Sequence, residues 1–196
     1  MENKRLEQQL NFVLELNKEK NIFRRTHVDS TRCENDAEHS WHIAIMIYLL
    51  REYANEEFDV LKAMTMALIH DVVEIDAGDT YAYDNQALAT QQEREQAAAE
   101  RIFGMLPDDQ KAEMIGLFNE FEEGITPEAR IARVMDNLQP MMLNDKNGGA
   151  DWKLHNVAKS QICKRNAKTP TGSAELWEFM KTLIQKNIDK GTIRDE

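Results

Sequence analysis

Apolar residues recur at spacings of three and four along almost the whole chain, and strict alternation of apolar and polar residues is nearly absent. This period matches the 3.6-residue turn of an α-helix rather than the two-residue repeat of a half-buried strand. The sequence therefore predicts an all-α fold. We expect helices over residues 3–19, 37–54, 58–76, 86–105, 108–122, 127–145, 149–168 and 173–189.

Prolines and glycines stand where these helices should begin and end. Pro107 and Pro127 fall in expected first turns, and Gly148 and Gly149 follow an expected end. No break is long enough to be a linker between domains. A chain of 196 residues fits one compact domain, which would bury roughly 70% of the surface of its unfolded state.

The charge balance restricts the partners of the chain. Asp and Glu number 35 against 24 Lys and Arg, giving a formal net charge of -11, so the surface should repel nucleic acid and anionic membranes. An anionic small-molecule substrate would need a local positive site. No apolar run approaches a membrane span, and two distant cysteines suit a reducing compartment. We expect a cytoplasmic protein with neither nucleic-acid nor membrane partners.

The stretch LIHDVVEIDAGD, residues 68–79, concentrates acids and an imidazole among aliphatic residues. On a helix His70 and Glu74 lie four residues apart on one face, and Asp71 flanks them. Buried carboxylates need a cation or a metal. The alternative is a core histidine beside a surface acid cluster. Gly78 resembles a helix end that turns Asp79 back toward the same place.

Two further stretches supply candidate ligands. In ENDAEHSWH, residues 34–42, His39 and His42 share a helix face and either could bind a metal, while Asp36 is a plausible N-cap for a helix that starts near residue 37. In ARIARVMDNLQPMML, residues 129–143, Asp136 is the one acid of an apolar helical run that contains Pro140.

A buried Asp136 would need a partner, and pairing with Arg130 or Arg133 is the alternative to a metal. Imidazole nitrogens together with carboxylate oxygens, and no thiolate, suit one divalent ion of intermediate hardness. Mn, Fe, Co, Ni or Zn fits this description, and Mg is a further possibility.

The order His39, then adjacent His70 and Asp71, then distant Asp136 resembles the metal-binding pattern of the HD-domain metal-dependent phosphohydrolases. The chain is most similar to the small single-domain group related to the 5'-deoxynucleotidases, over residues 12–177. The resemblance implies one HD domain over residues 1–196, with a metal-site core over about 24–145 and C-terminal helices over 149–189 packed on it. It also implies one catalytic divalent metal and hydrolysis of a phosphate monoester, typically a nucleoside 5'-monophosphate.

The same resemblance implies roles for further residues. Glu74 and Asp79 match acids of the family that lie near the attacking water and the substrate without binding the metal. Arg24 or Arg25 stands where the family places an arginine that contacts phosphate, although an exposed basic pair is the alternative, and Arg32 is a further candidate. The deoxynucleotidases follow that arginine with a tryptophan, whereas this chain has Arg25 and then Thr26, which puts selectivity for deoxyribose in doubt.

Two other functions remain open at this level. One is an HD-type phosphodiesterase of a signalling nucleotide, since such enzymes often carry extra metal-binding histidines and His42 is the spare histidine nearby. The other is a module that binds metal, nucleotide or protein without turnover. A homodimer is common among the relatives that the resemblance implies.

Overall fold

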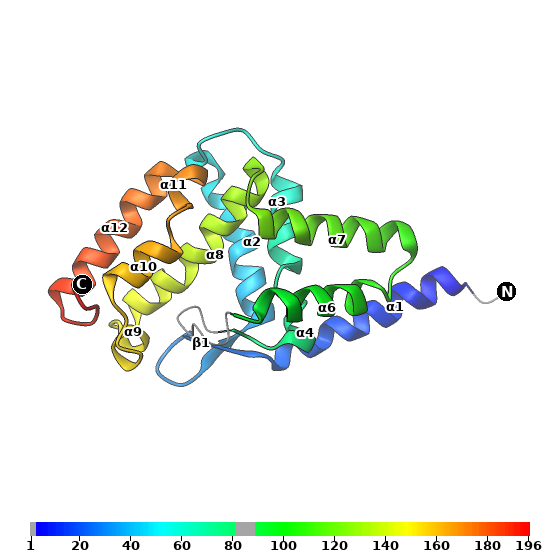
Figure 1. Ribbon diagram of the computed structural model, residues 1–196, viewed down its shortest axis with the longest axis horizontal. Helices are drawn as coiled ribbons and strands as arrows, with labels where there is room; N and C mark the ends of the chain where they lie inside the picture. The colour runs from blue at the N-terminus through cyan, green and yellow to red at the C-terminus, as the bar shows by residue number, and fades with distance from the viewer. Residues whose placement is uncertain (1–2, 81–88) are drawn as a thin grey trace.

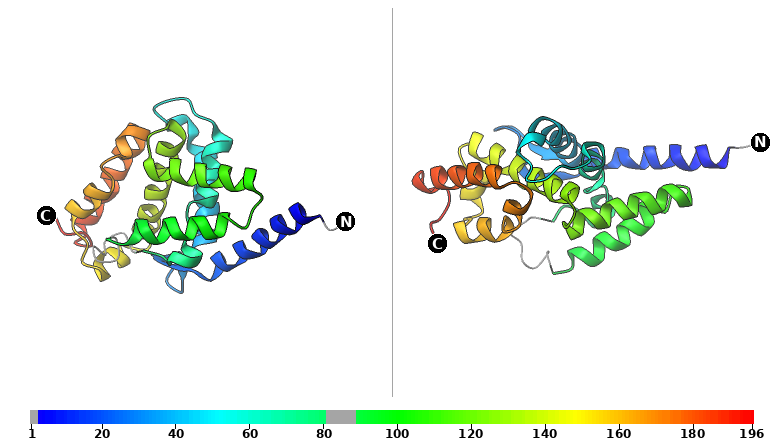
Figure 2. Two further views of the ribbon diagram at one scale, coloured as in Figure 1. Left: turned by 45° about the vertical axis from the view of Figure 1, so that its right-hand side comes forward. Right: turned by 90° about the horizontal axis from the view of Figure 1, so that it is seen from above.

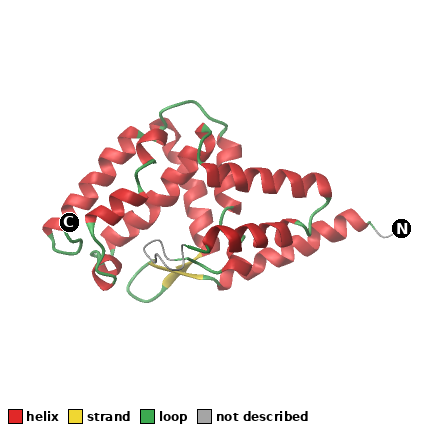
Figure 3. Ribbon diagram, in the orientation of Figure 1, coloured by secondary structure: helices red, strands yellow, loops and turns green. Residues whose placement is uncertain are grey.

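The computed structural model describes residues 3–80 and 89–196. The described part is built almost entirely from helices, so the expected all-α fold is confirmed (Figure 3). The α-helices are α1 (Lys4–Leu16), α2 (Asp36–Leu50), α3 (Val60–Ile69), α4 (Glu74–Ala77), α6 (Gln91–Phe103), α7 (Asp108–Glu123), α8 (Pro127–Lys146), α9 (Ala150–Leu154), α10 (Lys159–Arg165), α11 (Thr169–Gly172) and α12 (Ala174–Asp189), with 3₁₀ turns η1 (Asn17–Asn21) and η2 (Arg51–Tyr53).

Helix α8 runs through the middle of the molecule and packs against α2, α3, α7, α11 and α12 (Figure 1). Its buried side chains, among them Ile131 and Met135, join Ile43 and Ile47 of α2 in the larger core. Helices α1, α6 and α7 extend together toward one end of the molecule (Figure 2), where a second apolar cluster contains Phe103. Burial of such side chains is the main term that stabilises the helices against one another.

The start of α8 follows the expected chemistry, because Pro127 occupies its first turn and Thr126 caps it by accepting a hydrogen bond from the amide of Ala129 at 3.3 Å. Helix α8 continues through Pro140. Proline has no amide hydrogen, so the backbone carbonyl of Asp136, four residues earlier, lacks its usual helical partner. The proline of α8 thus removes a backbone hydrogen bond at the candidate metal ligand of this helix.

Two expected helices are interrupted. The helix predicted over 58–76 ends at Ile69, and tighter turns follow, such as the 2.8 Å bond from the amide of Glu74 to the carbonyl of Asp71. The helix predicted over 149–168 is divided into α9 and α10, because Asn156 adopts a positive φ of 53° between them. Part of the helix predicted over 86–105 lies outside the described residues.

A two-stranded antiparallel ribbon was not predicted. Strands β1 (Phe23–His27) and β2 (Cys33–Asn35) pair Phe23 with Asn35 and His27 with Cys33, and three to five residues are too few to show an alternating pattern. The ribbon leads directly into α2, whose N-cap is Asn35, in a reciprocal capping box with Glu38. The expectation that Asp36 caps this helix is therefore wrong, and Asp36 is fully buried instead.

Among the described helices, none combines the length and the apolar character that a bilayer crossing requires.

Candidate active site

Three side chains from distant parts of the chain converge inside the molecule. His39 comes from the first turns of α2, His70 follows the last residue of α3, and Asp136 lies in the middle of α8. The Nε2 atoms of His39 and His70 lie 3.1 and 3.8 Å from Oδ1 of Asp136. One ligand atom from each of the three residues lies within 4.8 Å of the others, which is the arrangement that a shared metal ion requires.

Hydrogen bonds on the far side of each ring fix how the histidines face this cluster. Nδ1 of His39 lies 3.1 Å from Oε1 of Gln139, and Nδ1 of His70 lies 2.9 Å from the backbone carbonyl of Ala67. Because both partners are acceptors, each Nδ1 carries the proton and donates it. Each Nε2 faces Asp136 and can offer a lone pair to a bound metal. Without a metal, burial alone would lower the pKa of both histidines, but the facing carboxylates raise it.

Gln139 is held in turn by a buried carboxylate. Its amide nitrogen donates to Glu34 at 2.5 Å and lies 3.2 Å from Nδ1 of His42. His42 therefore lies behind the first ring and outside the cluster of three. Of the two histidines left open by the sequence, the structure brings His39 to the cluster.

The site fits a divalent cation on the chemistry of its donors. Buried polar atoms around the cluster that have no hydrogen-bond partner include Nε2 of His70, Oδ2 of Asp36 and Oε2 of Glu74. Buried carboxylates and imidazole lone pairs without partners are costly unless a cation compensates them. Nitrogen and oxygen donors without sulfur match the metals of intermediate hardness expected from the sequence.

Asp71 lies beside the cluster and links it to Arg24 of β1. Its Oδ1 is 3.0 Å from Nε2 of His70, and its Oδ2 is 2.5 Å from Nη1 of Arg24, which also lies 3.5 Å from Asp36. Burial alone would raise the pKa of Asp71, but His70 and Arg24 lower it below its usual value. Asp71 is thus a carboxylate facing the ring of His70, although it is not one of the three clustered residues.

Glu74 and Asp79 line the same cavity of about 400 Å³ as His70, Asp71 and Asp136. Burial, with the neighbouring charges of Asp71 and Asp36, raises the pKa of Glu74 to about 12, so its carboxyl holds a proton when no cation is near. Burial also raises the pKa of Asp79. Asp79 follows Gly78, which ends α4 with a φ of 75° as its place in the sequence indicated.

Neither arginine proposed as a partner of Asp136 pairs with it. Arg130 bonds Glu56 at 2.8 Å, and Arg133 donates to the backbone carbonyl of Phe121 at 3.1 Å. Oδ2 of Asp136 instead faces Arg165 of α10, whose Nη2 is 3.7 Å away. Sequence reasoning missed Arg165, which stands 29 residues beyond Asp136 with no local signal that connects the two.

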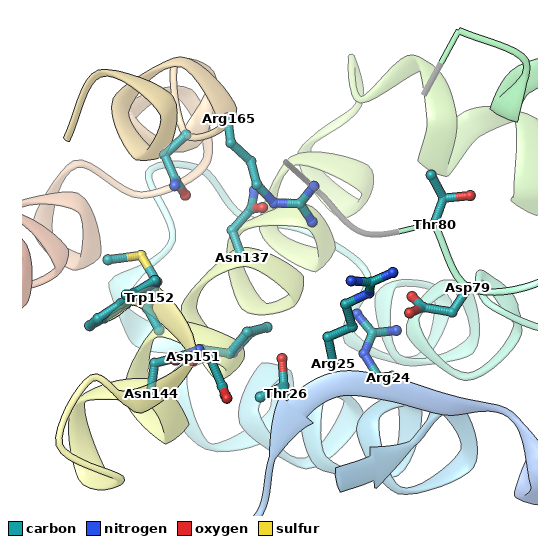
Figure 4. Close-up of a pocket in the computed structure, with 13 residues that line it drawn as sticks. Arg24, Arg25, Thr26, Asp79, Thr80, Asn137, Asn144, Asp151, Trp152 and Arg165 are labelled. Atoms are coloured by element: carbon teal, nitrogen blue, oxygen red, sulfur yellow. The ribbon is translucent and has the colours of Figure 1, made fainter. Parts of the chain in front are cut away.

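A second, smaller pocket adjoins the cavity and shares Arg24, Asp79, Thr80 and Arg165 with it. Figure 4 shows Arg25 and Arg165 extending toward the space between them, with Asn137 and Trp152 on the same wall. Its lining residues are Arg24, Arg25, Thr26, Asp79, Thr80, Asn137, Pro140, Met141, Asn144, Asp151, Trp152, Arg165 and Asn166.

Arg32 has no part in either space. It is an exposed residue bonded to Glu38 at 2.7 and 3.0 Å, and it lines neither the cavity nor the smaller pocket. Of the three candidate phosphate-binding arginines, Arg24 lies beside the cluster, and Arg25 lines the adjoining smaller pocket.

Comparison with known proteins identifies the family. The sequence model of the HD domain family matches residues 16–177 of this chain, which include all four expected ligands. The chain belongs to the HD domain family. The family expected from the sequence is thereby confirmed, and similarity to proteins named 5'-deoxynucleotidase confirms the expected relation to them.

A crystal structure of a "predicted metal-dependent phosphohydrolase" from Magnetospirillum magnetotacticum MS-1 is 44% identical to this HD domain, with a TM-score of 0.93 over 97% of this chain and 96% of the other. The 5'-deoxynucleotidase HDDC2 of Danio rerio is 31% identical over 107 residues, 54% of this chain and 52% of its own length. A 5'-deoxynucleotidase of Shewanella oneidensis is 32% identical over 97 residues, 45% of this chain and 50% of the relative. The matched part of this chain spans about half the length of these curated relatives.

Replacing Gln139 tests the hydrogen-bonded shell around His39. We expect Gln139→Ala to weaken divalent-metal binding about 10- to 100-fold, because the ring of His39 loses the acceptor that fixes its orientation. Metal affinity measured by competition with a chelating dye checks this. The exposed Gln185, which bonds Asp189 on α12, provides the control variant Gln185→Ala. Unchanged affinity in Gln139→Ala would mean that His39 needs no such support.

Proposed function

We propose that this HD domain protein is a metal-dependent phosphohydrolase that cleaves nucleoside 5'-monophosphates, ribo and deoxy. The observation that carries the proposal is the convergence of His39, His70 and Asp136 beside a cavity that His70 and Asp136 line together with Arg24 and Glu74. The names of its relatives, a metal-dependent phosphohydrolase and 5'-deoxynucleotidases, support the same reaction.

We propose that His39, His70, Asp71 and Asp136 hold one divalent ion. Such an ion, when bound, supplies a Lewis acid for the phosphoryl group and lowers the pKa of a coordinated water. With the ion bound, the rings would be neutral and offer Nε2 to it, because Gln139 and Ala67 accept their Nδ1 protons. Asp71 contributes the oxygen that faces His70, while Arg24 holds its other oxygen.

Glu74 is the proton acceptor for the attacking water in this proposal. It is buried in the wall of the cavity, and burial together with the carboxylates around it raises its pKa, which makes it a strong base. A bound cation would lower this pKa again, so that Glu74 is ionised and able to accept a proton from water. Water adds to phosphorus, the ester P–O bond breaks, and the leaving oxygen receives a proton. Asp79, at the junction of the cavity and the smaller pocket, contacts the leaving group or the sugar hydroxyl.

Arg24 and Arg25 supply positive charge for the phosphate. Guanidinium groups suit this role through their paired donors. Arg24 lines both the cavity and the smaller pocket, and Arg25 lines the smaller pocket. Because Arg25 stands in place of the tryptophan that follows this arginine in deoxynucleotidases, we propose weak discrimination between ribose and deoxyribose.

A substrate screen tests the proposed reaction. Ribo- and deoxyribonucleoside 5'-monophosphates, a general phosphatase substrate and a cyclic nucleotide are each incubated with the protein and Mn, Co, Ni, Zn or Mg, and phosphate release is measured. We expect release from both kinds of monophosphate and none from the cyclic diester, since His42 lies outside the cluster. Hydrolysis of the diester alone would instead indicate a phosphodiesterase.

The proposal extends to partners and location. We propose a cytoplasmic protein that does not bind nucleic acid, in keeping with its net charge of -11 and the absence of a disulfide between Cys33 and Cys163. We also propose a homodimer. Trp41, Tyr48 and Leu49 form an exposed apolar stripe on α2, with exposed fractions of 62%, 52% and 60%, and such a stripe is typical of a protein interface.

A further inference from the structure

A third cavity lies on the other side of Arg165 from the metal cluster. It is formed by α8, α10, α11 and the turns next to them, and five basic side chains line it, Arg130, Arg133, Lys164, Arg165 and Lys168. No acidic residue is among its described lining residues. The chain has a net charge of -11, so a cavity lined by five basic side chains is a local region of opposite charge. We call this space the basic pocket.

Acids outside the basic pocket compensate only part of this charge. Arg130 bonds Glu56 at 2.8 Å, and Arg133 lies 3.7 Å from Glu122. Within residues 3–80 and 89–196, Lys164 and Lys168 form no ion pair, and the one ionic neighbour of Arg165 is Asp136 at 3.7 Å. Three cations of the basic pocket thus keep donors for an anion.

The basic pocket adjoins the proposed catalytic cavity. Arg133 and Arg165 line both spaces, and Asn137 and Arg165 line both the basic pocket and the smaller pocket of Figure 4. Arg165 therefore stands where all three spaces meet, 3.7 Å from a candidate metal ligand. For a molecule whose reacting phosphoryl group lies at the cluster, Arg165 is thus the side chain that leads toward the basic pocket.

We propose that the basic pocket binds a second phosphoryl group of the substrate, so that the preferred substrate is a nucleotide with a phosphate at another position of the sugar besides the 5'-monoester. This inference rests on the proposed hydrolysis of nucleoside 5'-monophosphates. The reaction is unchanged: water adds to the 5'-phosphorus, the bond to the 5'-oxygen breaks, and the second phosphate stays on the product. Arg165, Lys164 and Lys168 bind that second phosphate through charge-assisted hydrogen bonds.

The test compares adenosine 3',5'-bisphosphate with adenosine 5'-monophosphate, using the double variant Lys164→Ala/Lys168→Ala. We expect wild type to have a kcat/KM for the bisphosphate that is about tenfold higher, since a hydrogen bond to a charged group contributes on this scale. The double variant should lose most of this preference. A fall in both rates with the ratio unchanged would mean general damage rather than a lost contact, and it would overturn the assignment. The exposed Lys181, paired with Glu178 on α12, gives the control Lys181→Ala, which should keep the wild-type ratio.

Binding of the same bisphosphate, measured by calorimetry without turnover, separates this inference from the proposed function. We expect about tenfold weaker binding to the double variant than to wild type or Lys181→Ala. If neither ester is hydrolysed but this difference in binding holds, the proposed reaction is wrong and the basic pocket stands. Equal binding by all three proteins, or equal kcat/KM for the two esters in wild type, overturns the basic pocket.

Discussion

Asp136→Ala is expected to lose its divalent metal and its phosphohydrolase activity together. Asp136 faces both Nε2 atoms, at 3.1 and 3.8 Å, so its replacement removes the carboxylate oxygen that lies between the two rings. Because a bound metal contributes several kcal/mol to charge stabilisation in such reactions, kcat/KM should fall at least about 10³-fold. Metal content by mass spectrometry and phosphate release on the same preparation check both effects.

The exposed Asp109, which pairs with Arg5 on the surface, provides the control Asp109→Ala, which should keep both metal and activity. Circular dichroism of Asp136→Ala separates loss of metal from loss of fold. A folded Asp136→Ala protein with full metal occupancy would exclude this carboxylate from the ligand set.

Glu74→Gln should separate proton transfer from metal binding. The amide keeps the shape of the side chain and removes its basicity, so the metal should remain while kcat falls about 10²- to 10⁴-fold, the usual contribution of a general acid or base. KM should change little, because Arg24 and the metal ligands are intact. Steady-state kinetics and metal content are measured together.

Asp71→Asn is the contrasting variant, and it should lose metal and activity in parallel. The exposed Glu100, paired with Lys111, gives the matched control Glu100→Gln. Should Glu74→Gln keep a near-normal kcat, or lose its metal as readily as Asp71→Asn, the roles given to these two acids would have to be exchanged or abandoned.

The all-α fold and the convergence of His39, His70 and Asp136 could be predicted from the sequence. The spacing of apolar residues shows which face of a helix is buried, so a helix can be predicted without knowing which other helices it packs against. Buried aspartates that lie next to histidines are unfavourable unless a cation compensates their charge, so these residues point to a metal site. The resemblance to the HD domain family then indicated that the three distant stretches form one site. No local pattern in the sequence contains that information.

The residues that orient the site could not be predicted in the same way. The ribbon that carries Arg24 is too short for a periodic signal, and the break after Ile69 depends on tight turns inside an apolar run. Gln139 is three residues from Asp136 on the same helix, so its position could have been derived from the helical repeat. Arg165 approaches Asp136 only in the folded chain, from α10, which is far from Asp136 in the sequence.

The most direct test of a metal-dependent phosphohydrolase is phosphate release from a nucleoside 5'-monophosphate before chelation, after removal of metal, and after one divalent ion per chain is returned. We predict that chelation abolishes release, that a stoichiometric ion among Mn, Co, Fe, Ni, Zn and Mg restores it, and that the metal-free chain remains folded. Undiminished release from the metal-free protein would contradict the account.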